Sequence, residues 1–407
     1  MSPSPSDPGG SGLGGGTPRF AVVGNPGNRR VESFTAAVTG AGLPAPRVLP
    51  WAEVLTGGAR FVAGETVRID SPGEDPLVER LLRGVDDPTR VEGTARWYAN
   101  FTAAVRRVAG AARPAGCALL DGPDDLAVLF DKRLCHGALS GAGVPVPPSP
   151  TSGPRAAPVT GWEDVRATMR DTGMRRVFVK LAHASSASGV LAVESGGRGR
   201  WRATTSVERA PDGGLFNSLR VRRYDGESDI AAVVDALAPD GLHIERWLPK
   251  ASQHGRAADL RVVVVAGEAT HALVRTGRSP MTNLHLGGAR GDLAAARAAA
   301  EAAGASWARV LEVCERAAAC FPATLCVGVD LLPAAGWRRF TVGEVNAFGD
   351  LLPRLTGLAG GRAEGRDTYA AQVDAVLRGA LPGGPAAGRP AAGGAGGREE
   401  ARGAAVR

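Results

Sequence analysis

The chain has 407 residues, a formal net charge of +7 and 44% hydrophobic residues. This length allows two or three domains that each bury a hydrophobic core. No run of 18 or more apolar residues predicts a membrane span, and residues 1–18 lack the pattern of a secretory signal, so we expect a cytoplasmic protein that does not bind membranes. The sequence contains no basic stripe interleaved with aromatic residues, so we do not expect nucleic-acid binding. The positive charge indicates an arginine-rich surface, which would also favour an acidic partner.

The five cysteines contain no Cys-x-x-Cys pair, which predicts free thiols in a reducing compartment. Cys314, Cys320 and Cys326 are evenly spaced, which by itself would suit a metal site. No histidine or second cysteine completes such a site, so we interpret these three residues as small buried hydrophobic side chains.

Lysine is rare in this chain, because only Lys132, Lys180 and Lys250 occur among 48 basic residues. The sequence is rich in Ala, Gly, Arg and Pro, as expected if arginine has replaced lysine wherever either residue would serve. Lysine has a compact ammonium group, whereas arginine has a planar fork of donors. The three lysines therefore mark positions where a compact cation is needed.

Three regions lie between two low-complexity tails. The tails, at 1–17 and 381–407, are rich in small residues, Pro and Arg, which predicts disorder. We expect an N-terminal α/β domain at 18–125, followed by two subdomains at 126–248 and 249–380.

The first region opens with an apolar run at 19–24, a loop and a helix-like pattern through Phe34 and Val38. This order of strand, loop and helix is typical of the start of an α/β domain. Further helical patterns occur at 76–82 and 95–108. The loop after the first strand either is a plain turn or binds an acidic group of a substrate.

The second region begins with a predicted helix at 131–140, which ends before a proline-rich breaker. A second helix is predicted at 162–171. Apolar runs then predict strands at 176–181, 190–193 and 242–248.

The third region alternates apolar runs with an alanine-rich segment. Strands are predicted at 260–266, 269–275, 325–332 and 340–345, and one long helix is predicted at 293–319. Strands that alternate with helices favour a mixed α/β (α+β) fold for the chain as a whole.

Two of these strands end in carboxylates. Asp330 ends one apolar strand, and Glu344 and Asn346 stand two residues apart at the end of the next. Side chains two residues apart point to the same face of a strand, so the three groups converge if the strands are neighbours. Carboxylate and amide oxygens suit Mg²⁺ shared with phosphates. The alternative is that these residues only form turns at strand ends.

A lysine in the middle of an apolar strand also needs explanation. Lys180 lies in such a strand and is costly to bury without a partner, which a phosphate or an adenine nitrogen would supply. The loop that follows is small enough for its amides to approach phosphates, although such loops also serve as ordinary hairpin connections. Its candidate residues are Ser185, Ser186, Ser188 and Gly189.

Further candidates follow along the chain. Glu245 ends a strand and is able to accept a hydrogen bond from an adenine amino group, or else forms an ordinary salt bridge. Arg275 follows a predicted strand, so it is placed to neutralise phosphoryl oxygens in a cleft. His285 is a candidate general base, but a lone histidine more often has a structural role.

Taken in order, these segments resemble the ATP-grasp superfamily, and most closely its bacterial ribosomal-protein glutamate ligase and glutathione-synthetase-like branch. The resemblance covers about 130–355 and is carried by the motifs DKRLCHGALSGAGVPVP, FVKLAHASSASGV, IERWLPK, DLRVVVV, NLHLGG, VGVDLL and GEVN. It implies an N-terminal pre-grasp-like domain followed by two α+β subdomains that clamp ATP. The region after Asn346 departs from the family pattern, so the acceptor pocket differs.

The resemblance also implies roles for individual residues. Catalysis would involve Arg275 and Lys180, and Mg²⁺, or Mn²⁺ in its place, would be held by Asp330, Glu344 and Asn346. Asp259 would contact the ribose, and Trp247 and Leu248 would line the adenine. The nucleotide-binding set comprises Lys132, Lys180, Ser185, Ser186, Ser188, Gly189, Glu245, Trp247, Leu248, Asp259 and Asn283.

The function implied is that of a ligase that uses ATP and Mg²⁺ to join a carboxylate to an amine or another nucleophile through an acyl phosphate. The substrates would be small molecules or peptides, and a homo-oligomer is plausible for this superfamily. Two alternatives stay open: an enzyme that stops at phosphoryl transfer, and a protein that binds the nucleotide without catalysis.

Overall fold

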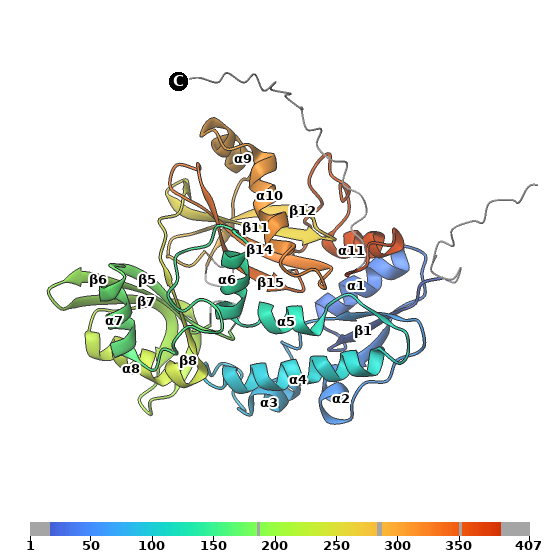
Figure 1. The fold of residues 1–407 in the computed structure, drawn as a ribbon, viewed down its shortest axis with the longest axis horizontal. Coiled ribbons are helices and arrows are strands. Elements are labelled where there is room, and N and C mark those ends of the chain that lie inside the picture. The colour runs from blue at the N-terminus through green and yellow to red at the C-terminus, as the bar shows by residue number, and fades with distance from the viewer. Residues whose placement is uncertain (1–16, 185–187, 283–286, 350–351, 384–407) are drawn as a thin grey trace, which may run out of the picture.

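The computed structural model describes residues 17–184, 188–282, 287–349 and 352–383, which form three β-sheets with helices packed around them (Figure 1). The N-terminal sheet, the left-hand antiparallel sheet and the upper C-terminal sheet surround a central region that contains α5 (Pro123–Leu129) and α6 (Lys132–Gly141). The tails predicted to be disordered lie almost wholly outside the described residues. No helix in the described part of the chain is both long and apolar enough to cross a membrane.

The N-terminal sheet is parallel, in the order β2-β1-β3-β4. Its central strand β1 is buried throughout, because helices cover both faces of a parallel sheet. Phe20 and Val22 contribute to one core, and Ala21 and Val23 to the other. The elements are β1 (Phe20–Gly24), α1 (Arg29–Gly40), β2 (Arg47–Pro50), α2 (Trp51–Thr56), β3 (Thr66–Ile69), α3 (Pro76–Arg83), α4 (Thr94–Ala112), β4 (Ala118–Leu119) and α5 (Pro123–Leu129).

The second sheet is antiparallel, in the order β8-β7-β6-β5-β9. The helix at 162–171 and the strand at 176–181 are confirmed, whereas no element was predicted for 200–237, which contains β7, β8 and α8. The elements are α6 (Lys132–Gly141), α7 (Trp162–Asp171), β5 (Arg176–Leu181), β6 (Val190–Gly197), β7 (Arg200–Arg209), β8 (Leu215–Tyr224), α8 (Glu227–Leu237) and β9 (Leu242–Arg246).

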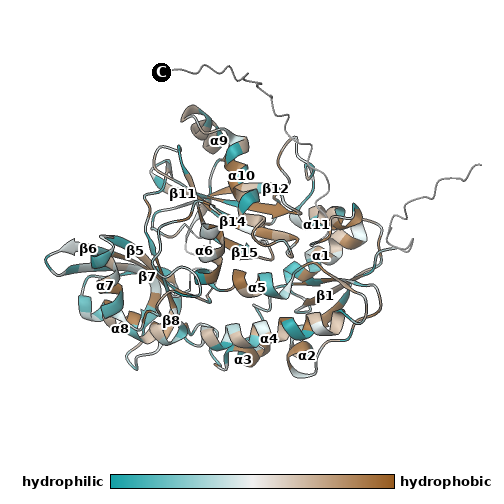
Figure 2. Ribbon diagram, in the orientation of Figure 1, coloured by the Kyte–Doolittle hydropathy of each residue, from teal (hydrophilic) through white to brown (hydrophobic). Residues whose placement is uncertain are grey.

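The third sheet has the order β13-β12-β11-β14-β15, with β10 beside β11. Figure 2 shows hydrophobic colouring along β12 and β14, whereas α9 carries both hydrophilic and hydrophobic residues. The elements are β10 (Ser252–Gln253), β11 (Arg256–Val265), β12 (Glu268–Gly277), β13 (Ala289–Arg290), α9 (Leu293–Ala302), α10 (Trp307–Ala318), β14 (Cys326–Pro333) and β15 (Phe340–Ala347).

The two faces of β11 pack against different partners. Leu260, Val262 and Val264 belong to the core that contains α10 residues, whereas Val263 and Val265 join the core shared with α1 and α11 (Thr368–Leu377). This alternation follows from the two-residue period of a strand. Near its start, β11 places Asp259 and Arg261 on the face that continues from Val263, and these charged residues form part of the candidate site.

The prediction of one helix at 293–319 is wrong, because the segment forms α9 and α10 with a turn between them. Gly304 has φ +86°, a left-handed conformation that glycine adopts without a steric cost. Ser306, the residue before α10, has extended backbone dihedrals. The alanine-rich composition favoured helix on both sides and concealed this break.

The five cysteines are unpaired thiols, as predicted. Cys314 and Cys326 are buried, in agreement with their interpretation as small hydrophobic residues, whereas Cys320 is partly exposed. Burial raises the pKa of the Cys326 thiol to about 12, so this group stays protonated and unreactive at neutral pH.

Helix α3 offers a matched test of the packing. Leu82 is fully buried, whereas Leu77 on the same helix is 51% exposed. Leu82→Ala should lower the free energy of unfolding by about 2–5 kcal/mol, because it leaves a cavity, and Leu77→Ala should change it by less than about 0.5 kcal/mol. Urea unfolding of the full chain measures both values. Equal effects of the two substitutions would contradict the observed packing of α3.

Candidate functional site

A row of charged side chains crosses the third sheet. Arg261 on β11 lies opposite Asp330 on β14, and Asp330 lies opposite Glu344 on β15. Residues directly opposite each other in antiparallel strands have side chains on the same face. Gly328 and Asn346 are paired two residues further along, so Asn346 shares this face. The convergence of Asp330, Glu344 and Asn346 expected from the sequence is therefore confirmed by the strand register.

Two arginines bind the carboxylate of Asp330. Arg261 Nε donates to Oδ1 at 2.5 Å and Arg261 Nη2 donates to Oδ2 at 3.2 Å, while Arg275 Nη2 lies 3.0 Å from Oδ1. Burial raises the pKa of Asp330, but the two guanidinium groups outweigh burial and leave the pKa below its ordinary value. Asp330 is therefore ionised at neutral pH.

Arg275 lies inside β12, so its predicted position after a strand is wrong. Its Nε donates to Asp259 Oδ1 at 2.8 Å, and the two residues are directly opposite each other on β12 and β11. The predicted strand at 269–275 was too short, because Thr276 and Gly277 continue the ladder. Arg275 thus joins two buried carboxylates, those of Asp259 and Asp330.

Asp259, the predicted ribose contact, is buried and already engaged by three groups. Besides Arg275, its carboxylate accepts a hydrogen bond from the Thr282 hydroxyl and lies 3.4 Å from Lys250 Nζ. Lys250 Nζ also donates to Thr282 Oγ1 at 2.9 Å. Burial lowers the pKa of Lys250, and the charge of Asp259 opposes that effect without cancelling it.

Lys132 reaches the other end of the charged row. It is the first residue of α6, which Asp131 caps by accepting hydrogen bonds from the amides of Arg133 and Leu134. Its Nζ forms an ion pair with Glu344 and donates to the carbonyl oxygen of Ala184 at 2.7 Å. Helix α6 therefore connects the C-terminal sheet with the loop that follows β5.

A second lysine–carboxylate pair lies on the second sheet. Lys180 Nζ on β5 is 2.5 Å from Glu245 Oε1 on β9, and the two side chains are only 14% and 4% exposed. Burial raises the pKa of Glu245, but Lys180 and His243 outweigh it and bring the pKa to about 2. Burial likewise lowers the pKa of Lys180, and Glu245 and Glu344 more than compensate. Both groups are charged at neutral pH.

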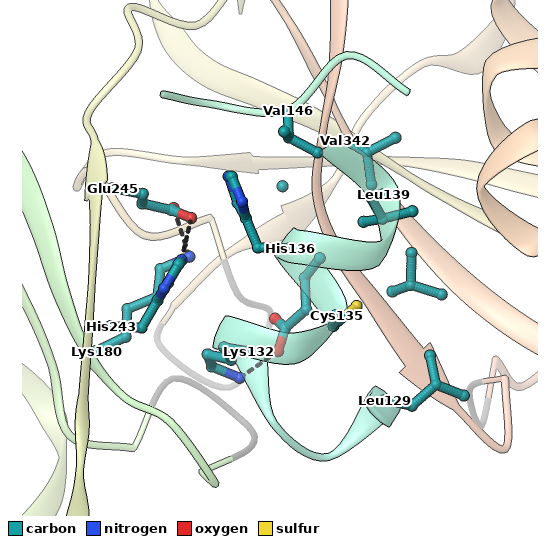
Figure 3. Close-up of a pocket in the computed structure, with 13 residues that line it drawn as sticks. Leu129, Lys132, Cys135, His136, Leu139, Val146, Lys180, His243, Glu245 and Val342 are labelled. Atoms are coloured by element: carbon teal, nitrogen blue, oxygen red, sulfur yellow. Dashed lines mark hydrogen bonds and ion pairs between the residues drawn. The ribbon is translucent and has the colours of Figure 1, made fainter. Parts of the chain in front are cut away.

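A pocket lies between these two pairs (Figure 3). The empty volume of this pocket is about 350 Å³, part of it open to solvent. Figure 3 shows Lys180, His243 and Glu245 together on one side and residues of α6 on the other. The lining consists of Leu129, Lys132, Cys135, His136, Leu139, Val146, Lys180, His243, Glu245, Val342, Gly343, Glu344 and Val345.

The other predicted nucleotide residues do not line this pocket or lie outside the described residues. Gly189 has φ +65°, and a Cβ there would approach Leu181 Cδ1 to 2.4 Å, so both backbone and packing require glycine. Trp247 packs against Phe178, with ring centroids 5.6 Å apart, and neither Trp247 nor Leu248 lines the pocket. Ser188 lines a second cavity. Ser185, Ser186, Asn283 and His285 lie outside the described residues.

Three residues of the site had no predicted role. Arg261 binds Asp330, and its signal was a second charged residue two positions after Asp259 in an otherwise apolar strand. His243 lies 3.5 Å from Glu245 and stands two positions before it. His136 has its ring 5.3 Å from that of His243, and its Nε2 lies 2.7 Å from the Pro147 carbonyl oxygen, so Nε2 carries the proton. Nothing in the local sequence predicts this contact.

Carboxylate and amide oxygens of the kind that bind small divalent cations share one face of β14 and β15. Asp330 and Glu344 supply carboxylate oxygens, and Asn346 donates its amide nitrogen to Gly328 O at 3.3 Å, which leaves its amide oxygen as the ligand atom. Among the described residues, no cluster of three or more His, Cys, Asp and Glu side chains suits a metal. Two carboxylates with ligands from a bound substrate are nevertheless the usual set for Mg²⁺.

Known structures share this architecture, although no protein-family model and no curated protein sequence matches the chain. The ATP-grasp ligase PsnB, solved in complex with a minimal precursor, is 17% identical with a TM-score of 0.51, and the match covers 89% of this chain and 99% of that chain. D-cycloserine synthetase DcsG is 16% identical with a TM-score of 0.54 and the same coverage. The chain therefore has the ATP-grasp fold. The narrower branch named from the motifs stays a prediction.

The Lys180–Glu245 pair makes stability depend on acid pH. The pKa of Glu245 is about 2 in the folded protein against 4.5 ordinarily, so its contribution is complete above about pH 4.5 and is lost as the pH falls towards 2. Glu245→Gln should lower the free energy of unfolding at pH 7 by about 3–5 kcal/mol, because Lys180 keeps a buried charge without a carboxylate. The difference from wild type should shrink below pH 4.5. Urea unfolding across pH tests this, and a difference independent of pH would contradict it.

Proposed function

We propose that this protein is a ligase that uses ATP and Mg²⁺ to activate a carboxylate and join it to an amine or another nucleophile. The observation that carries this proposal is the pairing of all three lysines with carboxylates around one region: Lys132 with Glu344, Lys180 with Glu245, and Lys250 with Asp259. Buried charges are costly to maintain, so such a concentration supports a functional site more than a structural one.

The pocket of Figure 3 is proposed to hold the nucleotide base. Glu245 would accept a hydrogen bond from the adenine amino group, and the apolar side chains of α6 and β15 would contact the ring. Lys132 and Lys180 would lie towards the phosphates, where ammonium groups neutralise negative charge. Ser188 and Gly189 flank the segment of the loop proposed to approach the phosphates.

Asp330, Glu344 and Asn346 would hold Mg²⁺, or Mn²⁺ in its place, which when bound offsets the negative charge of the phosphates. Arg275 and Arg261 keep the Asp330 carboxylate ionised and oriented. Lys132 would exchange its contact with Glu344 for a phosphate oxygen when the nucleotide binds. Lys132 would then neutralise a carboxylate in the free protein and a phosphate in the nucleotide complex.

The proposed reaction has two steps. A carboxylate oxygen of the substrate attacks the γ-phosphorus of ATP, and the bond between the γ-phosphorus and the oxygen that bridges to the β-phosphate breaks. This step forms an acyl phosphate and releases ADP. The nitrogen of an amine then attacks the acyl carbon, inorganic phosphate leaves, and the nitrogen loses a proton. The protein contributes positioning and charge stabilisation, with Lys180 and Arg275 as the cations proposed to act on the transferring group.

Removal of a metal ligand is the first test. Glu344→Gln and Asp330→Asn should lower Mg²⁺-dependent ADP release at least about a hundredfold, because the charge on the phosphates would no longer be offset. The control is Glu268→Gln, which removes an exposed carboxylate at the start of β12. Activity equal to wild type in both site variants would contradict the proposed metal site. Detection of a phosphorylated product, with no coupled product when amines are supplied, would favour a kinase instead.

The second test uses the rarity of lysine. Lys180→Arg keeps the positive charge but replaces a compact ammonium, held 2.5 Å from Glu245, with a larger planar group. It should weaken ATP binding at least about tenfold, as should Lys180→Ala, because the phosphate contact is lost or displaced. Arg170→Lys, at a 70% exposed side chain on α7, is the control. Titration with a non-hydrolysable ATP analogue measures binding, and unchanged affinity in both variants would exclude Lys180 from the nucleotide site.

A further inference from the structure

Two segments that are distant in sequence meet at Lys132, one at the start of α6 and one just after β5. The backbone amide of Lys132 donates to Ala182 O at 2.9 Å, and its Nζ donates to Ala184 O at 2.7 Å. His183 stands between these two acceptors in the chain, and its Nδ1 lies 3.1 Å from the carbonyl oxygen of Phe130. Three hydrogen bonds therefore join the start of α6 to the start of the loop after β5.

The imidazole of His183 has one defined tautomer. A carbonyl oxygen only accepts hydrogen bonds, so Nδ1 carries the proton that the Phe130 carbonyl accepts. The other ring nitrogen, Nε2, lies 3.5 Å from Arg133 Nη2 and 3.8 Å from Asp131 Oδ2. Burial lowers the pKa of His183, and the charge of Asp131 opposes this effect without cancelling it. The ring is therefore neutral at neutral pH, and the lone pair of Nε2 faces the Arg133 guanidinium.

Tyr98 of α4 holds the same ring from the side of the N-terminal domain. The rings of Tyr98 and His183 are stacked, with centroids 4.0 Å apart and an interplanar angle of 14°. The Tyr98 hydroxyl donates to the carbonyl oxygen of Ala127 at 2.8 Å, which fixes this side chain against α5. The side chain of His183 is only 7% exposed. It is thus held on one face by an aromatic ring and at its edge by a hydrogen bond.

His183 lies outside the pocket proposed for the nucleotide. A second cavity lies between α3, α4 and the loop after β5, with an empty volume of about 540 Å³, part of it open to solvent, and His183 and Ala184 line it. Lys132 is among the described residues that line the pocket of Figure 3, whereas His183 is not. An effect of His183 on a nucleotide in that pocket would therefore pass through another residue. The three hydrogen bonds point to Lys132 as that residue.

The ammonium group of Lys132 gains from such support. In this structure Nζ forms an ion pair with Glu344 and donates to Ala184 O. Lysine has a flexible stem, so placing its ammonium group accurately costs side-chain entropy. Under the proposed function a phosphate oxygen would replace Glu344, and Ala184 O would keep its hydrogen bond to Nζ. An acceptor that is fixed in advance reduces the cost of placing the ammonium group.

We propose that His183 is a positioning residue which, held by Tyr98 of the N-terminal domain, fixes Lys132 for contact with the phosphates of ATP. This inference rests on the function proposed above. His183 touches neither the nucleotide nor the metal. It fixes the chain that carries the carbonyl oxygens of Ala182 and Ala184, and these two acceptors orient Lys132. The placement of a nucleotide-binding lysine thereby depends on the N-terminal domain.

A double-mutant cycle tests whether His183 acts through Lys132. The four proteins are wild type, His183→Leu, Lys132→Met and the double variant, and calorimetric titration of the full chain with Mg²⁺ and a non-hydrolysable ATP analogue measures their affinities. We expect His183→Leu to weaken binding at least about tenfold with Lys132 present, and less than about twofold in the Lys132→Met background, which lacks the ammonium group. An equal loss in both backgrounds, or no loss in either, would refute the proposed role.

Further variants separate the two contacts of the ring and keep the proposal testable if His183→Leu does not fold. His183→Asn keeps a donor near the position of Nδ1, so it should bind the analogue at least about threefold more tightly than His183→Leu. Tyr98→Leu removes the stacked ring and should weaken binding at least about threefold, whereas Tyr98→Phe should bind within about twofold of wild type. Equal affinities of wild type, His183→Asn and Tyr98→Leu would overturn the proposal.

His271→Leu is the matched control. His271 is a fully buried histidine on β12 whose ring nitrogens lie 2.8 Å from Thr270 Oγ1 and 3.0 Å from Arg366 O, and it does not line the pocket of Figure 3. This variant should bind the analogue within about twofold of wild type, and a loss as large as that of His183→Leu would overturn the specific role of His183. A wild-type protein that binds no analogue would overturn the proposed function as well, whereas wild-type binding that His183→Leu leaves unchanged would overturn this inference alone.

Discussion

The arrangement of this protein depends on the neutralisation of buried carboxylates by fixed cations. Asp330, the acid at the centre of the third sheet, is bound by two arginines from neighbouring strands, and Arg275 also binds Asp259. Without these cations, ionised side chains on the inner part of a sheet would be strongly destabilising. The opposite faces of the same strands pack into apolar cores, so the charged row is held rigidly in place. The apolar core fixes the positions of the charged side chains, and the ion pairs stabilise these side chains in their ionised form inside the sheet.

The ion pairs also connect parts of the chain that are far apart in sequence. Lys132 on α6 contacts Glu344, 212 residues later, and the loop after β5 as well. Lys180 and Glu245 join two strands of the second sheet. The pocket is therefore lined by residues of the second sheet, the third sheet and α6 (Figure 3). Each lysine balances a carboxylate in this structure, so under the proposed function the phosphates would exchange partners with these lysines, which would limit the net cost of desolvation.

The second cavity follows a different physical rule. In the pocket of Figure 3, the ion pairs satisfy the charged groups, whereas Glu79, Arg83 and Thr94, which line the second cavity, each have one buried polar atom without a hydrogen-bond partner among the described residues. Lys132 lines the pocket of Figure 3, and its Nζ donates to the carbonyl oxygen of Ala184, a residue that lines the second cavity.

The sequence by itself determined the elements and residue types that depend on local order. Apolar runs predicted β5, β14 and β15, and the two-residue period placed Glu344 and Asn346 on one face. The rarity of lysine selected three residues that all form ion pairs with carboxylates. Only the tertiary structure decided which charges meet. Arg261 faces Asp330 because of the register between β11 and β14, and Glu79, Arg83 and Thr94 share a cavity because α3 packs on α4. Register and helix packing arise from contacts between distant segments, which no local pattern of residues encodes.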